Sequence, residues 1–293
     1  MKLSSIQIDG HTASLSLWSA ATESTLTPIH FAHANGFPAG SYTQFLALLS
    51  AQRDVFALDH RAVWENSPYQ PRTNFKWHDA ANDLIAAIEK FSPNGVIGVG
   101  HSLGATTTLL AAAKRPDLFK QILLIEPIIF PTRLFVQFAW MPAPLRARLI
   151  GLAKRTLQRR ETWASREEFV RALSGKSLFK GFSPEVLGDY AEHGLRQISD
   201  QTGEKLTLRF RKAWEAQVFM TPPYVWRKLK ALQVPCVVWR GETSTTLPKV
   251  SWDKWAKVRP DLPVHVLPSL GHMAPLQNPQ LMAQEIQKHV LSV

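Results

Sequence analysis

The chain has 293 residues, of which 45% are hydrophobic, so it can bury a large core as one elaborated domain or two small domains. No window holds the roughly eighteen uninterrupted apolar residues of a membrane-spanning helix, and the first residues lack the apolar core of a signal peptide. The single cysteine, Cys236, excludes an intramolecular disulfide and suits a reducing compartment, so we expect a globular protein of the cytoplasm.

The net charge of +11 is concentrated in one part of the chain. Residues 133–230 contain 19 Lys and Arg against 9 Asp and Glu, a net of +10, which leaves +1 for the rest. Basic residues at helical spacing within 144–160 favour a solvated helix face, and peripheral contact with an anionic membrane is the alternative. No nucleic-acid reader motif accompanies the charge, so we expect no nucleic-acid partner.

Short β-type runs alternate with helical patterns along most of the chain. Strands are predicted at residues 5–10, 13–18, 29–34, 54–59, 96–101, 121–126, 235–240 and 263–268, and helices near 41–50, 76–90, 103–114, 248–257 and 275–290. This alternation is typical of parallel strands joined by crossover helices. The segment 131–230 shows helical patterns, loops and scattered prolines but no convincing strand.

The sequence therefore predicts an α/β fold with a mostly parallel central sheet, flanking helices and an inserted helical segment. Residues 1–130 and 231–293 are expected to form the core, and residues 131–230 the insertion. An open α/β sheet carries its chemistry in the loops at the carboxyl ends of its strands. Ser102, Glu126 and His272 all stand at or just after the ends of predicted strands.

Ser102 lies in the pentapeptide Gly100-His101-Ser102-Leu103-Gly104, a match to G-x-S-x-G between a predicted strand and a predicted helix. A serine on such a sharp turn has a strained backbone, and small neighbours let strand and helix approach closely. Its hydroxyl would face the free N–H groups of the helix N-terminus, which favour developing negative charge. A helix N-cap serine is the alternative, but it does not explain both glycines.

Several motifs in this order resemble the α/β-hydrolase superfamily over nearly the whole chain. They are "HANGFP" (33–38), "LDHRAVW" (58–64), "GHSLGA" (100–105) and "GHMAPLQNP" (271–279), with the insertion in the position of the family's cap. The resemblance implies a nucleophile at Ser102 and an oxyanion hole formed by the backbone N–H groups of Phe37 and Leu103. Asn35 stands where the family usually has a histidine, and we assign it to substrate binding.

His272 is the candidate general base among ten histidines. It follows the last predicted strand in a loop, from which an imidazole can reach Ser102, and the resemblance places the family's histidine at the same position. A packed or surface histidine is the alternative interpretation.

The acid of the expected triad departs from the family pattern. Most of the family carries an aspartate in the loop that is "RGETSTTLP" (240–248) here, and serine and threonine occupy the expected positions. An imidazole that becomes charged needs a buried anion to orient it. Glu126, at the end of the preceding strand, is our first candidate, Glu242 is the second, and a site without a carboxylate is the third.

The expected reaction is hydrolysis of a carboxylic ester, thioester or lactone of a small molecule through an acyl-serine intermediate. Acyl transfer or perhydrolysis on the same residues, and a non-catalytic binding protein of the same fold, are the alternatives. Neither metal-ligand spacing nor a dinucleotide glycine motif is present, so we expect no metal and no cofactor. Phe130, Phe138 and Trp140 are candidates for an apolar substrate wall, although such spacing is more often core packing.

Overall fold

The computed structural model covers residues 1–293 and describes all of them except 69, 72–74, 143–144, 147–149, 201–202 and 292–293. Its centre is an eight-stranded sheet in the order β1-β2-β4-β3-β5-β6-β10-β11. The strands are β1 (Lys2–Ile8), β2 (His11–Trp18), β3 (Ile29–Ala32), β4 (Val55–Leu58), β5 (Val96–His101), β6 (Phe119–Ile125), β10 (Cys236–Gly241) and β11 (Val264–Leu267). The β1–β2 and β2–β4 pairs are antiparallel, and every pair from β4 to β11 is parallel. The prediction of a mostly parallel sheet is confirmed.

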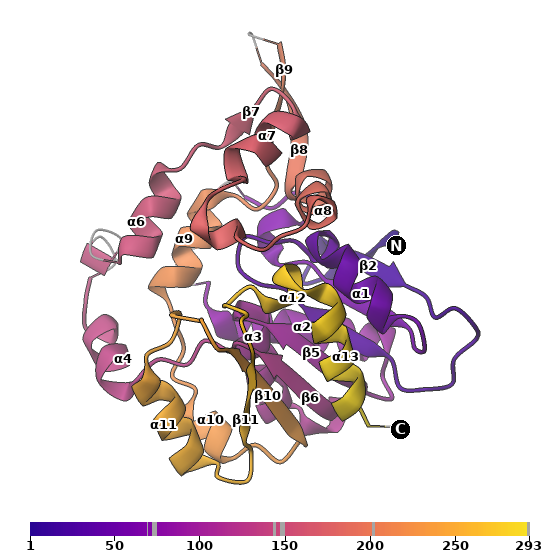
Figure 1. Cartoon of the computed structure of the whole chain (residues 1–293), viewed down its shortest axis with the longest axis vertical. Helices are drawn as coiled ribbons and strands as arrows, with labels where there is room; N and C mark the ends of the chain where they lie inside the picture. The colour runs from indigo at the N-terminus through magenta and orange to yellow at the C-terminus, as the bar shows by residue number, and fades with distance from the viewer. Residues whose placement is uncertain (69, 72–74, 143–144, 147–149, 201–202, 292–293) are drawn as a thin grey trace.

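Two hydrophobic cores lie on opposite faces of this sheet, because successive strand side chains point to opposite sides. In β6, Ile122 and Leu124 belong to one core, whereas Leu123 and Ile125 belong to the other. The first core is covered by α2 (Trp77–Phe91), α3 (Leu103–Lys114), α10 (Trp226–Lys230) and α11 (Lys249–Val258). The second is covered by α1 (Thr43–Leu49), α12 (Ala274–Gln277) and α13 (Pro279–His289) (Figure 1). Burial on both faces explains why the central strands are near-continuous apolar runs.

The insertion, residues 131–230, leaves the sheet between β6 and β10, which are neighbours in it. Its helices are α4 (Thr132–Ala139), α6 (Gly151–Gln158), α7 (Arg166–Leu173), the 3-10 turn η4 (Ser177–Phe179), α8 (Pro184–Gly194), α9 (Lys212–Met220) and α10. It also contains a three-stranded antiparallel sheet of β7 (Thr162–Trp163), β9 (Gly203–Leu208) and β8 (Leu195–Asp200). The prediction of an insertion without strands is therefore wrong.

The strands of the insertion carry a weak sequence signal because little of their surface is buried. In β9, Leu208 is buried while the preceding residues are exposed or half-buried. Figure 1 shows this small sheet at the end of the molecule remote from β10 and β11. Polar and charged residues interrupt the alternation in both long strands, so the period of two is hard to recognise.

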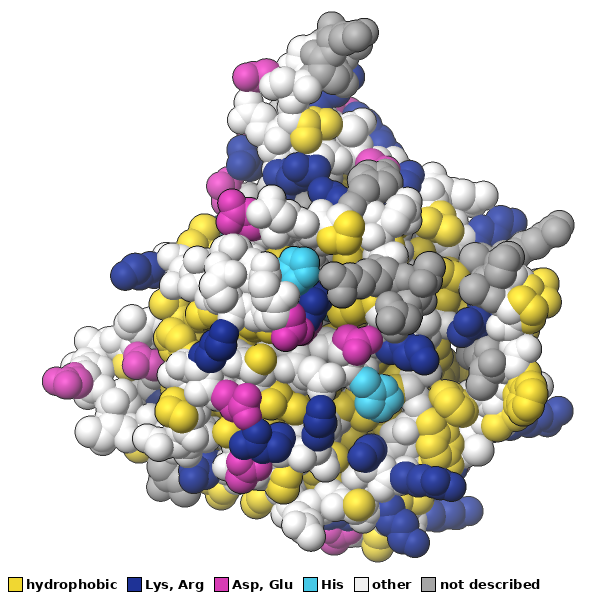
Figure 2. Space-filling model, turned by 180° about the vertical axis from the view of Figure 1, so that it is seen from behind, with side chains coloured by type: hydrophobic (Ala, Val, Ile, Leu, Met, Phe, Trp, Pro, Cys, Tyr) yellow, Lys and Arg dark blue, Asp and Glu magenta, His cyan; other side chains and the backbone are white. Residues whose placement is uncertain are grey.

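On the face seen in Figure 2, charged side chains do not gather in one patch of a single sign. Within the described residues, no helix is both long and apolar enough to cross a bilayer. Lys and Arg side chains are dispersed over the face seen in Figure 2 and intermixed with acidic and apolar side chains. This dispersion is what a solvated basic surface produces.

We expect the protein to lose stability as the pH falls below about 6.5 because three histidines are buried in the uncharged form. Burial lowers the pKa of His30, His60 and His101 to about 3 in each case. Below their ordinary pKa the unfolded chain binds protons that the folded chain does not. Each histidine then removes about 1.4 kcal/mol from the free energy of unfolding per pH unit, down to about pH 3.

Urea unfolding between pH 7.5 and 4.5 measures this dependence, and His30→Leu isolates one of the three groups. His30 has no hydrogen-bond partner for either ring nitrogen among the described residues, so its replacement breaks no polar contact. Below pH 6.5 the free energy of unfolding of the variant should fall less steeply with decreasing pH, by about 1.4 kcal/mol per pH unit. An unchanged slope would mean that His30 is not neutral in the folded protein.

Candidate active site

Ser102 occupies the turn between β5 and α3 in a strained backbone conformation. Its φ of 56° and ψ of −115° lie outside the regions favoured by residues with a side chain, and its N–H donates to the Ile125 carbonyl at 2.9 Å. The side chain makes no capping hydrogen bond to α3. Ser102 thus stands at the N-cap position of α3 without capping the helix through its side chain, and its hydroxyl is free for another partner.

Both glycines of the pentapeptide are needed for close packing. A Cβ atom at Gly104 would lie 2.0 Å from the Ala32 carbonyl oxygen, and one at Gly100 would lie 2.6 Å from the Ala105 Cα. No heavy atom can be accommodated at such distances from backbone. The two glycines thus let α3 approach the ends of β3 and β5, which brings Ser102 to the edge of the sheet.

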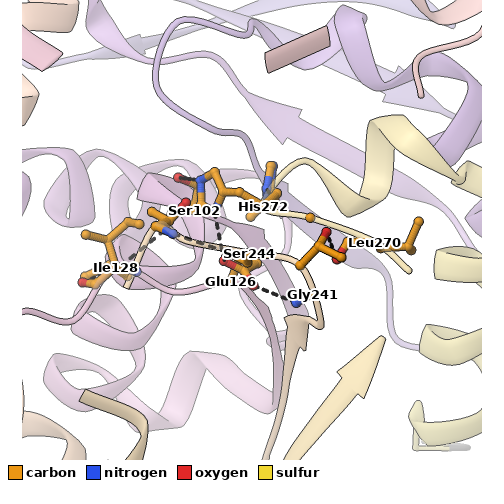
Figure 3. Close-up of polar contacts among 12 residues, drawn as sticks. Ser102, Glu126, Ile128, Gly241, Ser244, Leu270 and His272 are labelled. Atoms are coloured by element: carbon orange, nitrogen blue, oxygen red, sulfur yellow. Dashed lines mark hydrogen bonds and ion pairs between the residues drawn. The ribbon is translucent and has the colours of Figure 1, made fainter. Parts of the chain in front are cut away.

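His272 bridges Ser102 and Glu126 from the loop after β11. Its Nε2 lies 2.9 Å from Ser102 Oγ, and its Nδ1 lies 2.9 Å from Glu126 Oε2 (Figure 3). A carboxylate only accepts hydrogen bonds, so Nδ1 carries the proton and Nε2 is free to take the serine proton. The three side chains form one hydrogen-bonded chain, which we call the Ser-His-Glu chain.

Glu126 is buried at the end of β6 with 1% of its surface exposed. Its φ of 52° is left-handed, and its N–H donates to the Trp239 carbonyl at 2.8 Å. Besides His272, its carboxylate accepts hydrogen bonds from the Gly241 N–H at 2.6 Å and the Ser244 hydroxyl at 2.7 Å (Figure 3). Three donors compensate for the burial of this negative charge.

The other two carboxylates near the strand ends have structural partners instead. Glu242 is exposed, and its carboxylate accepts the Ser269 N–H at 2.8 Å. Asp59 accepts the Ala39 N–H at 2.8 Å and so ties two loops together. Of these three carboxylates, Glu126 is the one that the structure brings to His272.

His101, next to Ser102, fixes the loop that carries His272. Its Nε2 lies 2.7 Å from the His272 carbonyl oxygen, and its Nδ1 lies 2.8 Å from the Tyr42 hydroxyl. The carbonyl can only accept, so Nε2 carries the proton and Nδ1 accepts from Tyr42. Burial lowers the pKa of His101 to about 3, so this residue stays neutral and supports the turn rather than exchanging protons.

The two expected oxyanion donors differ in their present partners. Leu103 is the first residue of α3, where a helix N–H has no partner within the helix. The Phe37 N–H donates to the Ala34 carbonyl at 3.2 Å and closes a turn in which Gly36 has a φ of 82°. Phe37 would have to share or leave this bond to bind an oxyanion, and its assignment stays a prediction.

The insertion contacts the loop that contains Asn35 and Phe37. The Asn35 side-chain amide donates to the Glu215 carbonyl at 3.0 Å, and the Tyr190 hydroxyl donates to the Gly36 carbonyl at 3.3 Å. The Tyr190 ring stacks on Phe37 with centroids 4.6 Å apart. The Asn35 amide is thus engaged by the insertion, and its assignment to substrate binding stays a prediction.

A partly buried ion pair supports this contact. Arg159 reaches the Glu215 carboxylate with Nη1 at 3.0 Å and Nη2 at 2.5 Å, and burial raises the pKa of Glu215. A Cβ at Gly36 would lie 2.8 Å from Glu215 Oε2. The sequence analysis missed Glu215 and Tyr190, because only the folding of the insertion onto residues 35–37 gives them a role.

The aromatic wall differs in part from the one predicted. Trp140 projects into solvent with 87% exposure, Phe130 is half-buried, and the side chain of Phe138 lies outside the described part of the structure. Instead, Phe179 and Phe182 approach Phe37 with ring centroids at 6.0 and 6.5 Å. In the sequence, these two phenylalanines stand three residues apart in "SLFKGF" (177–182), and this spacing is the pattern that could have pointed to them.

The site is nearly closed in this conformation. Ser102 is 7% exposed, and the His272 side chain is 19% exposed. Within the ranges that the structure describes, no three His, Cys, Asp or Glu side chains converge as metal ligands would. What the geometry offers is an oriented serine, an imidazole and a buried carboxylate, the set required for nucleophilic attack on an acyl carbon.

The alpha/beta hydrolase family model matches residues 31–285. The chain therefore belongs to the alpha/beta hydrolase family, and both the expected resemblance and the fold class are confirmed.

The individual relatives are distant in sequence. The 2-(acetamidomethylene)succinate hydrolase of Mesorhizobium japonicum is 25% identical over 253 residues, which cover 81% of this chain and 78% of that protein. The type I acyl-CoA thioesterase mpaH of Penicillium brevicompactum is 31% identical over 125 residues, 42% of this chain and 27% of that protein. The solved thioesterase domain from the curacin biosynthetic pathway superposes with a TM-score of 0.78 at 15% identity, covering 98% of this chain and 99% of its own.

Gly104→Ala should destabilise the protein by at least about 2 kcal/mol, because the new Cβ would overlap the Ala32 carbonyl and force α3 away from β3. Gly151→Ala is the matched control, since nothing lies within 4 Å of a Cβ at that position. Thermal unfolding of both variants measures the difference. Equal melting temperatures for Gly104→Ala and wild type would contradict the tight packing described for the turn.

Proposed function

We propose that this chain is a serine hydrolase that cleaves an ester or thioester through an acyl intermediate on Ser102. The observation that carries the proposal is the Ser-His-Glu chain, with 2.9 Å from Ser102 Oγ to His272 Nε2 and 2.9 Å from His272 Nδ1 to Glu126 Oε2. These are proton-transfer distances, and the order Ser102, Glu126, His272 in the chain is the order usual for this fold.

In the proposed reaction, His272 Nε2 takes the Ser102 proton while Oγ attacks the acyl carbon. Glu126 holds the imidazole in the required tautomer and stabilises its positive charge. The negative charge on the former carbonyl oxygen develops near the N-terminus of α3, where the Leu103 N–H can donate to it. His272 then protonates the leaving group, activates a water molecule that attacks the acyl carbon, and returns the proton to Ser102.

The insertion is proposed to act as the cap over this site. Its aromatic residues Phe179, Phe182 and Tyr190 stand next to Phe37, which suits an apolar acyl group. The names of the relatives, a succinate-derivative hydrolase and an acyl-CoA thioesterase, support cleavage at an acyl carbon. Comparison of a p-nitrophenyl ester with the acyl-CoA of the same chain length distinguishes oxygen from sulfur leaving groups.

A fluorophosphonate probe should label wild type on Ser102 and should not label Ser102→Ala, as read from the mass of the intact protein and its peptides. We expect Glu126→Gln to slow labelling by about 10²-fold to 10⁴-fold because the imidazole loses its anion. Glu242→Gln is the control and should change the rate by less than about twofold, since that carboxylate contacts the Ser269 N–H at the surface. A larger drop in labelling rate for Glu242→Gln than for Glu126→Gln would assign the acid to the loop 240–248. The absence of any adduct on wild type would favour a binding protein.

A further inference from the structure

Ser244 stands in the loop where proteins that this chain resembles carry their acid. The loop follows β10, and its sequence "RGETSTTLP" (240–248) has no aspartate. The Ser244 hydroxyl donates to Glu126 Oε2 at 2.7 Å. It therefore reaches the carboxylate of a different strand at the oxygen that also binds His272 (Figure 3).

The carboxylate of Glu126 is held from two sides. Oε1 accepts the Gly241 N–H at 2.6 Å, while Oε2 accepts the Ser244 hydroxyl at 2.7 Å and the His272 Nδ1–H at 2.9 Å. Because a carboxylate oxygen can only accept, the hydroxyl proton of Ser244 lies between Ser244 Oγ and Glu126 Oε2, and the Thr246 N–H makes at most a long contact with Ser244 Oγ at 3.5 Å. One donor on each oxygen fixes the plane of the carboxylate, and the remaining lone pair of Oε2 points to the imidazole.

We propose that Ser244 is a positioning residue for the reaction, acting through Glu126 on His272. The inference rests on the proposed function, because it concerns the same Ser-His-Glu chain. Ser244 orients the Glu126 carboxylate, and its hydrogen bond also partly neutralises the negative charge on Oε2. Without it, the carboxylate can rotate about its last side-chain bond, and the charge that faces His272 increases.

The sign of the pH effect follows from the groups that face the imidazole. Glu126 at the end of β6 is the charged one, at 2.9 Å. His101 at the end of β5, with ring centroids 5.3 Å away, is neutral because burial lowers its pKa to about 3, and Ser102 is uncharged. Loss of the Ser244 hydroxyl leaves more negative charge on Glu126, which favours the protonated imidazole. The reaction should then require a higher pH to reach half of its maximal rate.

The test is the second-order rate constant for fluorophosphonate labelling of Ser102, measured from pH 5 to 10 in the full chain. For Ser244→Ala we expect a maximal rate lower by about fivefold and a half-maximum at higher pH than in wild type. Ser244→Thr keeps the hydroxyl and should restore both values. Thr243→Val is the matched control, because it removes a hydroxyl of the same loop that donates to the Leu270 carbonyl at 2.9 Å and not to Glu126.

A second comparison tests the placement of residue 244 directly. Glu126→Ala should be labelled slowly, and adding Ser244→Asp should raise the rate by about tenfold or more, because a carboxylate at 244 extends into the space that Glu126 Oε2 vacates. A double variant no faster than Glu126→Ala would overturn the geometric argument.

The outcomes separate the two proposals. If Ser102 is labelled in wild type while Ser244→Ala matches wild type in rate and pH dependence, the role of Ser244 is refuted and the hydrolase proposal stands. If Ser244→Ala and Thr243→Val lower the labelling rate equally, the loss comes from disturbance of the loop in general, and the role of Ser244 is also refuted. If wild type is not labelled on Ser102, both proposals fail together.

Discussion

The register between three neighbouring parallel strands is the constraint on which the site depends. Ile125 of β6 pairs with His101 of β5 and with Trp239 of β10, so the three strands reach the same level. The residues that follow, Ser102 and Glu126, both have a positive backbone φ angle. They donate their N–H groups to carbonyls of the adjacent strands. The spacing between Ser102 and Glu126 is therefore set by the spacing of strands, about 4.8 Å each, and not by flexible loops.

Burial makes this arrangement effective and also demands that every polar group be satisfied. Glu126 has three donors, and His101 is a neutral link between Tyr42 and the His272 carbonyl. In a medium of low polarity, fixed donors and charges act more strongly than they would in water. The same network holds the imidazole in place, so the proposed reaction would need little reorganisation of these groups.

The sequence was informative where function coincides with the end of a strand. Ser102 and His272 could be placed because their motifs and the strand pattern agree, and Glu126 because it ends β6. The choice between Glu126 and Glu242 needed coordinates, since both loops border the same edge. Tyr190 could not be predicted, because its contact depends on how the insertion folds back. Aromatic spacing near Trp140 marks an apolar helix face without specifying what that face meets.

The packing of the Glu215 side chain against Gly36 joins the insertion to a loop of the core. The carboxylate fills the space that a side chain at position 36 would need, and Arg159 keeps it there. The two segments are thus shaped to one another, and a larger side chain at position 36 would displace Glu215. Such a pairing makes the insertion a poor candidate for transplantation between relatives, unless the donor's own glycine-containing loop travels with it.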